Sequence, residues 1–125
     1  MNLPIYYQFP KDKNPTLISL NKYERLHGIP RNALKKYYYK LISDKLNKTP
    51  IKGKVKTEYT YFYKNSLSDA PNVISVVDKI FMDCLQINDI IKDDNVINYT
   101  GSSWKVGGKD KENPRVEIRV IEVVQ

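Results

Sequence analysis

The clearest pattern in the chain is an alternation of apolar and polar side chains over residues 51–63. Successive side chains of a β-strand point to opposite faces, so this pattern predicts a strand with one buried and one exposed face. The predicted buried face consists of Ile51, Gly53, Val55, Thr57, Tyr59, Tyr61 and Tyr63. The other face would carry Lys52, Lys54, Lys56, Glu58, Thr60 and Phe62.

Two segments have the three- and four-residue periodicity of amphipathic helices. The first is expected to begin at Pro30, a favoured first-turn residue, and to end near residue 46. Its stripe consists of Leu34, Tyr37, Tyr38, Leu41 and Lys45. The second should run from 69–71 to 85 or 86, with Val73, Ile74, Val76, Val77, Ile80, Phe81, Cys84 and Leu85 on one side. The opposite side would carry Asn72, Ser75, Asp78, Lys79, Met82, Asp83 and Gln86.

The remaining elements are shorter. Residues 3–9 are expected to form a strand, and Pro4 indicates that this strand lies at the edge of a sheet. Residues 10–29 are expected to form a long loop with a turn at 21–26. Two further strands are expected over residues 96–106 and 114–124, joined by a turn region at 107–110. The order strand, helix, strand, helix, strand, strand predicts one α+β domain over residues 1–125, with a mixed sheet of about four strands and two main helices.

Charge is distributed unevenly along the 125 residues, which carry a net charge of +7. Residues 1–68 contain 14 basic and 4 acidic side chains, whereas residues 69–94 contain 2 basic and 6 acidic ones. A polyanion is expected to bind the first segment, and the second supplies carboxylates for a divalent cation. A metal-dependent nuclease needs both features.

Other classes of protein are not favoured. The chain opens without a signal-like segment and has no apolar run of roughly 20 residues, so we expect a cytoplasmic protein that does not enter a membrane. The single cysteine, Cys84, cannot form an intrachain disulfide and is expected in the core. His27 is the only histidine, which disfavours a zinc site.

The candidate metal ligands are Asp69, Asp83, Asp93 and Asp94, because Mg²⁺ prefers oxygen ligands. Each also has an ordinary structural interpretation: Asp69 as a helix cap, Asp83 as a solvated partner of Lys79, and Asp93-Asp94 as a polar turn. Lys79 either pairs with Asp83 or stabilises negative charge on a phosphate that is being cleaved. Spacing alone does not separate these alternatives.

Two groups of residues are candidates for nucleic-acid contacts. Lys52, Lys54 and Lys56 would stand about 6.8 Å apart on one strand face, close to the spacing of phosphates along a strand, although such lysines also keep sheet edges soluble. Several tyrosines are candidates for stacking on unpaired bases. They are Tyr6, Tyr7, Tyr37, Tyr38 and Tyr39.

The order and spacing of several short motifs resemble the RusA family of Holliday junction resolvases, common in phages and prophages. The motifs are Asp69-Ala70-Pro71-Asn72, Lys79, Asp83-Cys84-Leu85 and Ile90-Ile91-Lys92-Asp93-Asp94-Asn95. The early Ser19-Leu20-Asn21-Lys22-Tyr23 segment is similar to a family loop that contains Asn and Tyr. The likeness extends over nearly the whole chain.

The resemblance implies a Mg²⁺- or Mn²⁺-dependent homodimer that nicks four-way DNA junctions, as in recombination and repair. It implies catalytic roles for Asp69, Lys79 and Asp94, with Asp93 and Asp83 as further metal ligands. We expect DNA contacts from Asn21, Lys22, Arg25, Arg31, Lys35, Lys36, Lys52, Lys54, Lys56 and Asn72.

The chain departs from the family pattern at two places. Pro71 replaces the second Asp of the opening motif, and the interval from Asn72 to Lys79 is longer by about one helical turn, which preserves the helix face. Asn72, Asp78 or Asp83 would have to replace the missing oxygen ligand. The alternative is a protein that binds branched DNA without cleaving it.

Overall fold

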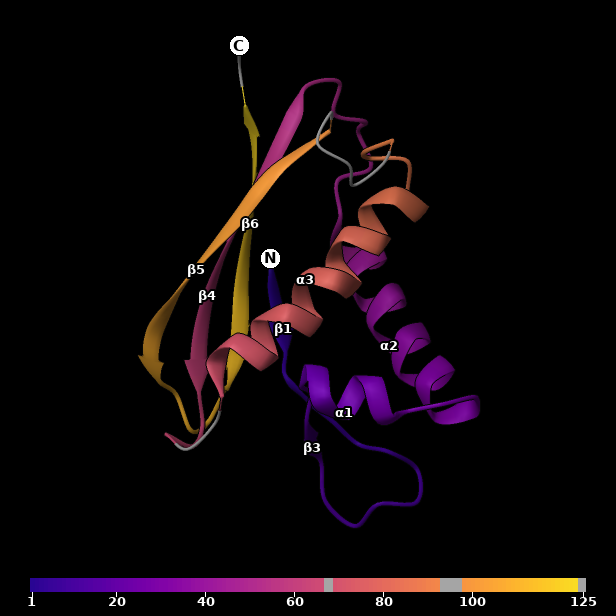
Figure 1. Ribbon diagram of the computed structural model, residues 1–125, viewed down its shortest axis with the longest axis vertical. Coiled ribbons are helices and arrows are strands. Elements are labelled where there is room, and N and C mark those ends of the chain that lie inside the picture. The colour runs from indigo at the N-terminus through magenta and orange to yellow at the C-terminus, as the bar shows by residue number, and fades with distance from the viewer. Residues whose placement is uncertain (67–68, 93–97, 124–125) are drawn as a thin grey trace.

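The computed structural model describes residues 1–66, 69–92 and 98–123. Three helices and six strands are assigned in this part of the chain. In chain order they are β1 (Asn2–Pro4), β2 (Tyr6–Tyr7), β3 (Thr16–Leu17), α1 (Leu20–Arg25), α2 (Ile29–Lys45), β4 (Lys54–Tyr63), α3 (Ala70–Ile87), β5 (Tyr99–Lys109) and β6 (Arg115–Val123). Figure 1 shows the helices gathered on one side of a long sheet.

The main sheet has the strand order β1-β6-β4-β5. β4 pairs antiparallel with β6 and parallel with β5, so the sheet is mixed. β1, which contains Pro4, lies at an edge, as predicted, because proline cannot donate a ladder hydrogen bond. The prediction of an α+β domain with a mixed four-stranded sheet is therefore confirmed.

Two N-terminal predictions needed correction. The strand expected over 3–9 is divided at buried Ile5: β1 joins the main sheet, whereas β2 pairs with β3 in a separate two-stranded sheet. The expected turn at 21–26 is the six-residue helix α1. Its N-cap, Ser19, accepts a 3.2 Å hydrogen bond from the backbone N–H of Lys22, which satisfies a group that the first turn leaves unpaired.

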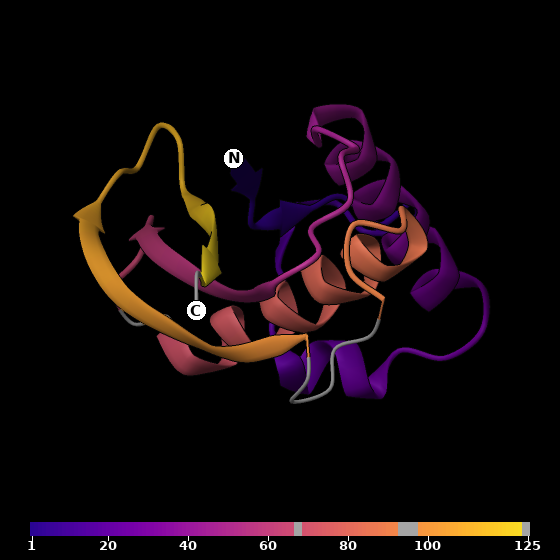
Figure 2. The same cartoon turned by 90° about the horizontal axis from the view of Figure 1, so that it is seen from above.

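The strand β4 has the predicted alternation. Val55, Thr57, Tyr59 and Tyr61 are all buried, and the intervening positions are half-buried or exposed. The buried face lies toward α3, which connects the parallel strands β4 and β5 across that side of the sheet (Figure 1). Figure 2 shows that the sheet is strongly curved.

The helix α3 contributes much of the core. All eight predicted inward residues are buried. Met82 was expected on the outer side of the helix but is only 3% exposed. The other helices and the sheet together cover more of the circumference of α3 than the single predicted apolar stripe. In α2 the buried stripe is Leu34, Tyr38 and Ile42. Tyr37, predicted to lie in the stripe, is exposed and packs on Tyr7 at 5.1 Å between ring centroids.

The strand β5 ends at Lys109, three residues later than expected, and includes the glycines that were predicted to form a turn. It has register shifts against β4 near both of its ends. Gly101 and Gly108 lie near these shifts with φ of 137° and 138°, a region that other residues rarely adopt. No helix in the described ranges is long and apolar enough to cross a bilayer.

Candidate active site and nucleic-acid interface

Asp69 occupies the N-cap position of α3, directly before Ala70. Its side chain makes no capping hydrogen bond to the helix backbone. Instead, Oδ2 accepts a 2.7 Å hydrogen bond from Nδ2 of Asn72. Asp69 is exposed, so the carboxylate is oriented by its neighbour and remains accessible to a ligand. This arrangement differs from the ordinary capping role that the sequence left open.

Lys79 is exposed and has no ion pair with Asp83, nor with any other described carboxylate. The pairing of Lys79 with Asp83, one of the two alternatives that the sequence left open, is therefore not formed. Asp83 is half-buried and accepts a 3.4 Å hydrogen bond from the hydroxyl of Tyr39 on α2. Burial, followed by the nearby charge of Asp83, raises the pKa of the Tyr39 hydroxyl above its usual range.

Cys84 is fully buried next to Asp83. Burial, and secondarily the charge of Asp83, raises the pKa of its thiol to about 12. A thiol with so high a pKa carries little thiolate at neutral pH and is a poor nucleophile. This supports the prediction that Cys84 is a core residue.

The candidate residues on α3 are spread along the helix axis. Asn72 and Lys79 are seven residues apart, which places them on one face about 10 Å apart along the axis. Asp83 lies 14 positions after Asp69, which corresponds to about 21 Å. Ligands of one Mg²⁺ lie only about 2 Å from the ion. Asp69 and Asp83 of the same chain therefore do not share an ion.

Asp93 and Asp94 lie outside the described residues. The backbone before and after them is attached beside the start of β4: Ile90 accepts a 2.8 Å hydrogen bond from Ile51, and Asn98 a 2.9 Å bond from Val55. Asp69 follows the other end of β4, at the N-terminal end of α3 (Figure 1). The 18 residues of α3 span about 27 Å between these two ends.

The sequence did not predict the environment of Asp78. This residue was expected on the outer side of α3 but is half-buried and faces the sheet, where Tyr59 and Tyr99 donate their hydroxyl hydrogens to Oδ1. Tyr99 is also within 2.9 Å of the Thr57 hydroxyl. Burial and then the charge of Asp78 raise the pKa of Tyr59 above its usual range. Asp78 thus accepts hydrogen bonds from hydroxyl groups between α3 and the sheet. The one signal in the sequence was Thr57, a polar residue on the predicted buried face of β4 that needs a hydrogen-bond partner.

The predicted DNA-contact residues on α1 and α2 differ in accessibility. Asn21, Lys22, Arg25 and Lys36 are exposed, whereas Arg31 and Lys35 are half-buried. The guanidinium of Arg31 lies over the ring of Tyr23 at 4.4 Å, and Lys22 lies 5.4 Å from the ring centroid of Phe9. Both side chains therefore also support the packing of the N-terminal region.

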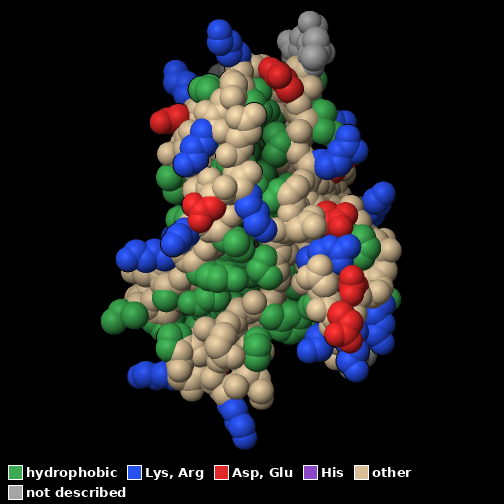
Figure 3. Space-filling model, turned by 180° about the vertical axis from the view of Figure 1, so that it is seen from behind, with side chains coloured by type: hydrophobic (Ala, Val, Ile, Leu, Met, Phe, Trp, Pro, Cys, Tyr) green, Lys and Arg blue, Asp and Glu red, His purple; other side chains and the backbone are tan. Residues whose placement is uncertain are grey.

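The lysines of the predicted strand begin just before β4. Lys52 and Lys56 are exposed, and Lys54 is half-buried. The same face also carries Glu58, which lies 3.6 Å from Arg119 of β6. Figure 3, which shows the molecule from behind the view of Figure 1, likewise shows acidic side chains among basic ones. The lysine row is therefore part of a mixed surface.

The tyrosines proposed for base stacking are not equally available. Tyr38 is 1% exposed, and its hydroxyl donates a 2.7 Å hydrogen bond to the carbonyl of Pro4. It is a core residue. Tyr6, Tyr7 and Tyr39 are half-buried, and Tyr37 is exposed.

Within residues 1–66, 69–92 and 98–123, no three His, Cys, Asp or Glu side chains are grouped closely enough to hold a metal ion. Asp93 and Asp94 lie outside these ranges. No protein-family model matches the chain, and no curated protein shows significant similarity to it.

Proposed function

We propose that this protein is a structure-selective endodeoxyribonuclease that cleaves four-way or other branched DNA as a homodimer. The observation that carries the proposal is the exposed carboxylate of Asp69, which Asn72 orients at the start of α3 without using it as a helix cap. The motif around these two residues is the one that resembles the RusA family. The basic composition of residues 1–68 supports a polyanionic substrate.

The proposed site uses Asp69 and Asp94 as metal ligands, with Asp93 beside them. Carboxylates fit Mg²⁺ or Mn²⁺, and such an ion would supply Lewis-acid activation of water and of the phosphate. Asn72 holds the Asp69 carboxylate in one orientation. Lys79, exposed on the same helix face, places a positive charge near the phosphate oxygens where negative charge develops.

We further propose that the site is shared between two subunits. Asp69 lies at one end of the helix, and the described residues on either side of Asp93 and Asp94 are attached near the other end. A two-fold dimer can bring unlike ends of two copies together. We therefore assign Asp69 of one protomer and Asp94 of the partner subunit to one ion. Asp83, turned toward Tyr39, serves as a neighbouring charge in this arrangement.

A mixing experiment tests this assignment. Asp69→Asn and Asp94→Asn should each abolish cleavage of a four-way junction in Mg²⁺ or Mn²⁺ while leaving junction affinity nearly unchanged, because each variant removes a negative charge beside DNA. Mixing and refolding the two inactive variants together should restore nicking, since each heterodimer regains one intact site. A site formed within one chain would leave the mixture inactive.

The second candidate function is binding of branched DNA without cleavage. Pro71 favours it, because the family pattern places a carboxylate at that position. Under this alternative the wild-type protein binds the junction in a salt-sensitive manner but cuts no strand with either metal. Metal-dependent paired nicks that Asp69→Asn eliminates would exclude it.

A further inference from the structure

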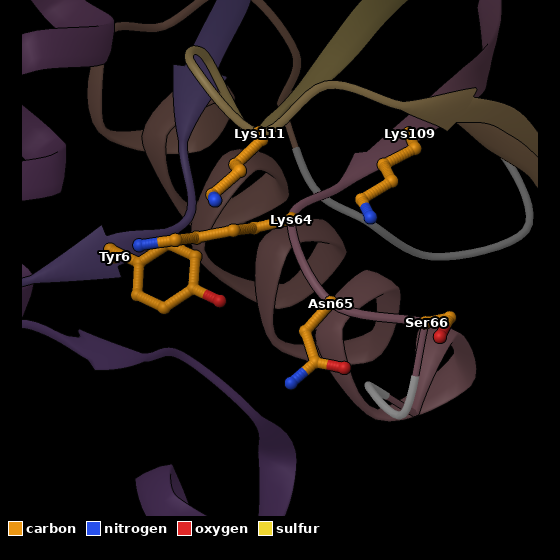
Figure 4. A pocket seen from close by; sticks show the side chains of 6 residues that line it. All are labelled: Tyr6, Lys64, Asn65, Ser66, Lys109 and Lys111. Carbon is orange, nitrogen blue, oxygen red and sulfur yellow. The ribbon is translucent and has the colours of Figure 1, made fainter.

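A surface pocket of about 350 Å³ lies at the end of β4. It is lined by Tyr6, Lys64, Asn65, Ser66, Lys109 and Lys111. Tyr6 belongs to β2, Lys64 to Ser66 follow β4, Lys109 ends β5, and Lys111 lies in the β5–β6 connection. Figure 4 shows the side chains of Lys64 and Lys111 directed toward Tyr6, while Lys109 extends from the end of β5 on the other side of Lys64.

Among the described residues, no carboxylate lines this pocket. Asp110 stands between Lys109 and Lys111 in the sequence, but its carboxylate is directed to Arg115, with 2.7 Å between Oδ2 and the guanidinium Nη1. The backbone N–H of Asn113 also donates to this carboxylate, at 3.0 Å. The acidic residue between the two lysines is thus engaged elsewhere, and the exposed Glu112, which follows Lys111, does not line the pocket.

The three lysines have no ion pair with any described residue. The ammonium group of Lys64 lies 5.5 Å from the ring centroid of Tyr6, which holds this side chain across the pocket. Cations gathered in one place repel one another, and a bound anion relieves that repulsion. The pocket is therefore suited to a negatively charged ligand.

The geometry favours a phosphate over a carboxylate. Ammonium groups from separate segments approach the pocket from different directions, which suits the tetrahedral oxygens of a phosphate better than a planar carboxylate. The lining also includes the hydroxyls of Tyr6 and Ser66, which can donate hydrogen bonds to phosphate oxygens. A backbone phosphate carries no sequence information, so a contact of this kind would act without sequence preference.

We propose that this lysine pocket binds one backbone phosphate of a DNA strand and thereby positions that strand at the N-terminal end of α3. The inference rests on the proposed function, because Asp69 follows Ser66 by only three residues at the same end of β4. A strand fixed by a phosphate here would pass beside the Asp69 carboxylate.

The first test compares two double variants with equal loss of charge. Lys109→Gln/Lys111→Gln alters the pocket, whereas Lys13→Gln/Lys48→Gln removes two exposed lysines elsewhere. The pocket variant should bind the junction about 10-fold more weakly near 0.1 M salt, and the slope of log affinity against log salt should fall by about 1 to 2. The control should change both quantities much less, and thermal unfolding should show that both variants fold.

The second test identifies the phosphate. Single methylphosphonate substitutions, which remove one backbone charge, are placed along each arm of the junction. Wild-type protein should lose affinity at one position, and the pocket variant should be insensitive at that position because the contact is already lost. Equal sensitivity of both proteins at every position would overturn the pocket assignment.

The outcomes separate the two proposals. If wild-type protein binds and cuts the junction while the pocket variant matches it in affinity and salt slope, the pocket inference fails and the proposed function stands. If wild-type protein binds no DNA, the proposed function and the strand assignment both fail. Titration of wild-type protein with inorganic phosphate, followed by NMR signals of Lys109 and Lys111, then shows whether the pocket binds phosphate from another source.

Discussion

Asn72 donates a 2.7 Å hydrogen bond from its side-chain amide to Oδ2 of Asp69, one turn earlier at the start of α3. The carboxylate thereby forgoes the backbone N–H groups that an N-cap aspartate usually binds. A carboxylate that is already oriented loses less freedom when it binds an ion. Together with Lys79, the pair forms the described part of the proposed active site.

Asn72→Ala should lower metal-dependent cleavage by about 10- to 100-fold, because partners that orient a metal ligand typically contribute that much to affinity or activity. The loss should shrink at high Mg²⁺ concentration if the defect lies in ion binding. Ser75→Ala on the same helix is the matched control, since Ser75 is exposed and, within the described part of the chain, its hydroxyl bonds only to the carbonyl of Pro71. Unchanged cleavage in Asn72→Ala would contradict the positioning role.

Asp78 and Lys79 are adjacent in sequence but should give opposite phenotypes. Asp78→Ala leaves the buried hydroxyl of Tyr59 without its acceptor and should reduce the free energy of unfolding by about 1–3 kcal/mol. Lys79→Ala should leave stability nearly unchanged, because Lys79 is exposed and without a described ion pair. Lys79→Ala should instead reduce cleavage by about 10²- to 10³-fold.

Urea unfolding and junction cleavage, measured on both variants, check this pair of expectations. An Asp78→Ala variant as stable as the wild type would show that the tyrosine hydroxyls find other hydrogen-bond partners. A fully active Lys79→Ala would remove Lys79 from the proposed site.

Gly107→Ala should destabilise the sheet. A Cβ atom at this position would lie 2.6 Å from Cζ of Phe62, and Arg115 covers the same ring at 4.0 Å. Overpacking of this kind costs about 1–3 kcal/mol. Phe62→Leu in the same chain should recover part of the loss, which a double-mutant cycle measures as a coupling energy. Ser103→Ala, at an exposed position of β5, should have little effect.

The ion pair between Asp110 and Arg115 predicts a pH dependence of stability. The hydrogen bond from Arg115 is the main cause that lowers the pKa of Asp110 below its ordinary value of 3.8. Because the folded-state pKa is depressed, the interaction stabilises the fold above that ordinary value and is lost as the pH falls through the lower folded-state value.

The difference in Tm between wild type and Asp110→Asn should therefore be largest near neutral pH and should shrink below about pH 3.8. Thermal melts across this range measure it. Asp44→Asn, an exposed residue with no hydrogen bond or ion pair in the described part of the chain, is the control. A difference that grows on acidification would contradict the sign of the pKa shift.

The local pattern of apolar and polar residues was sufficient to predict the main helices and strands. The alternation around Tyr59 and the helical periodicity around Ile80 identified β4 and α3, because burial of one face imposes periods of about 2 and 3.6 residues. The sequence did not indicate which strands pair. β5 and β6 follow one another in the chain, but β4 lies between them, and this order depends on contacts between distant residues.

The candidate site shows the same division. Asp69, Asn72 and Lys79 were identified by residue type and spacing, and helical geometry alone places Asn72 and Lys79 on one face. The sequence could not show that Asn72 orients Asp69, that Asp78 faces the sheet, or that α3 separates Asp69 from the flanks of Asp93 and Asp94 by about 27 Å.

The sequence by itself determined the periodic elements, the charge asymmetry and the residue types available for chemistry, because these depend on neighbours along the chain. Only the tertiary structure decided which side chains meet. Lys64, Lys109 and Lys111 line one pocket because the ends of β4 and β5 lie together, while Arg115 engages Asp110 outside that pocket. Such convergence depends on strand order and register, which periodicity does not encode.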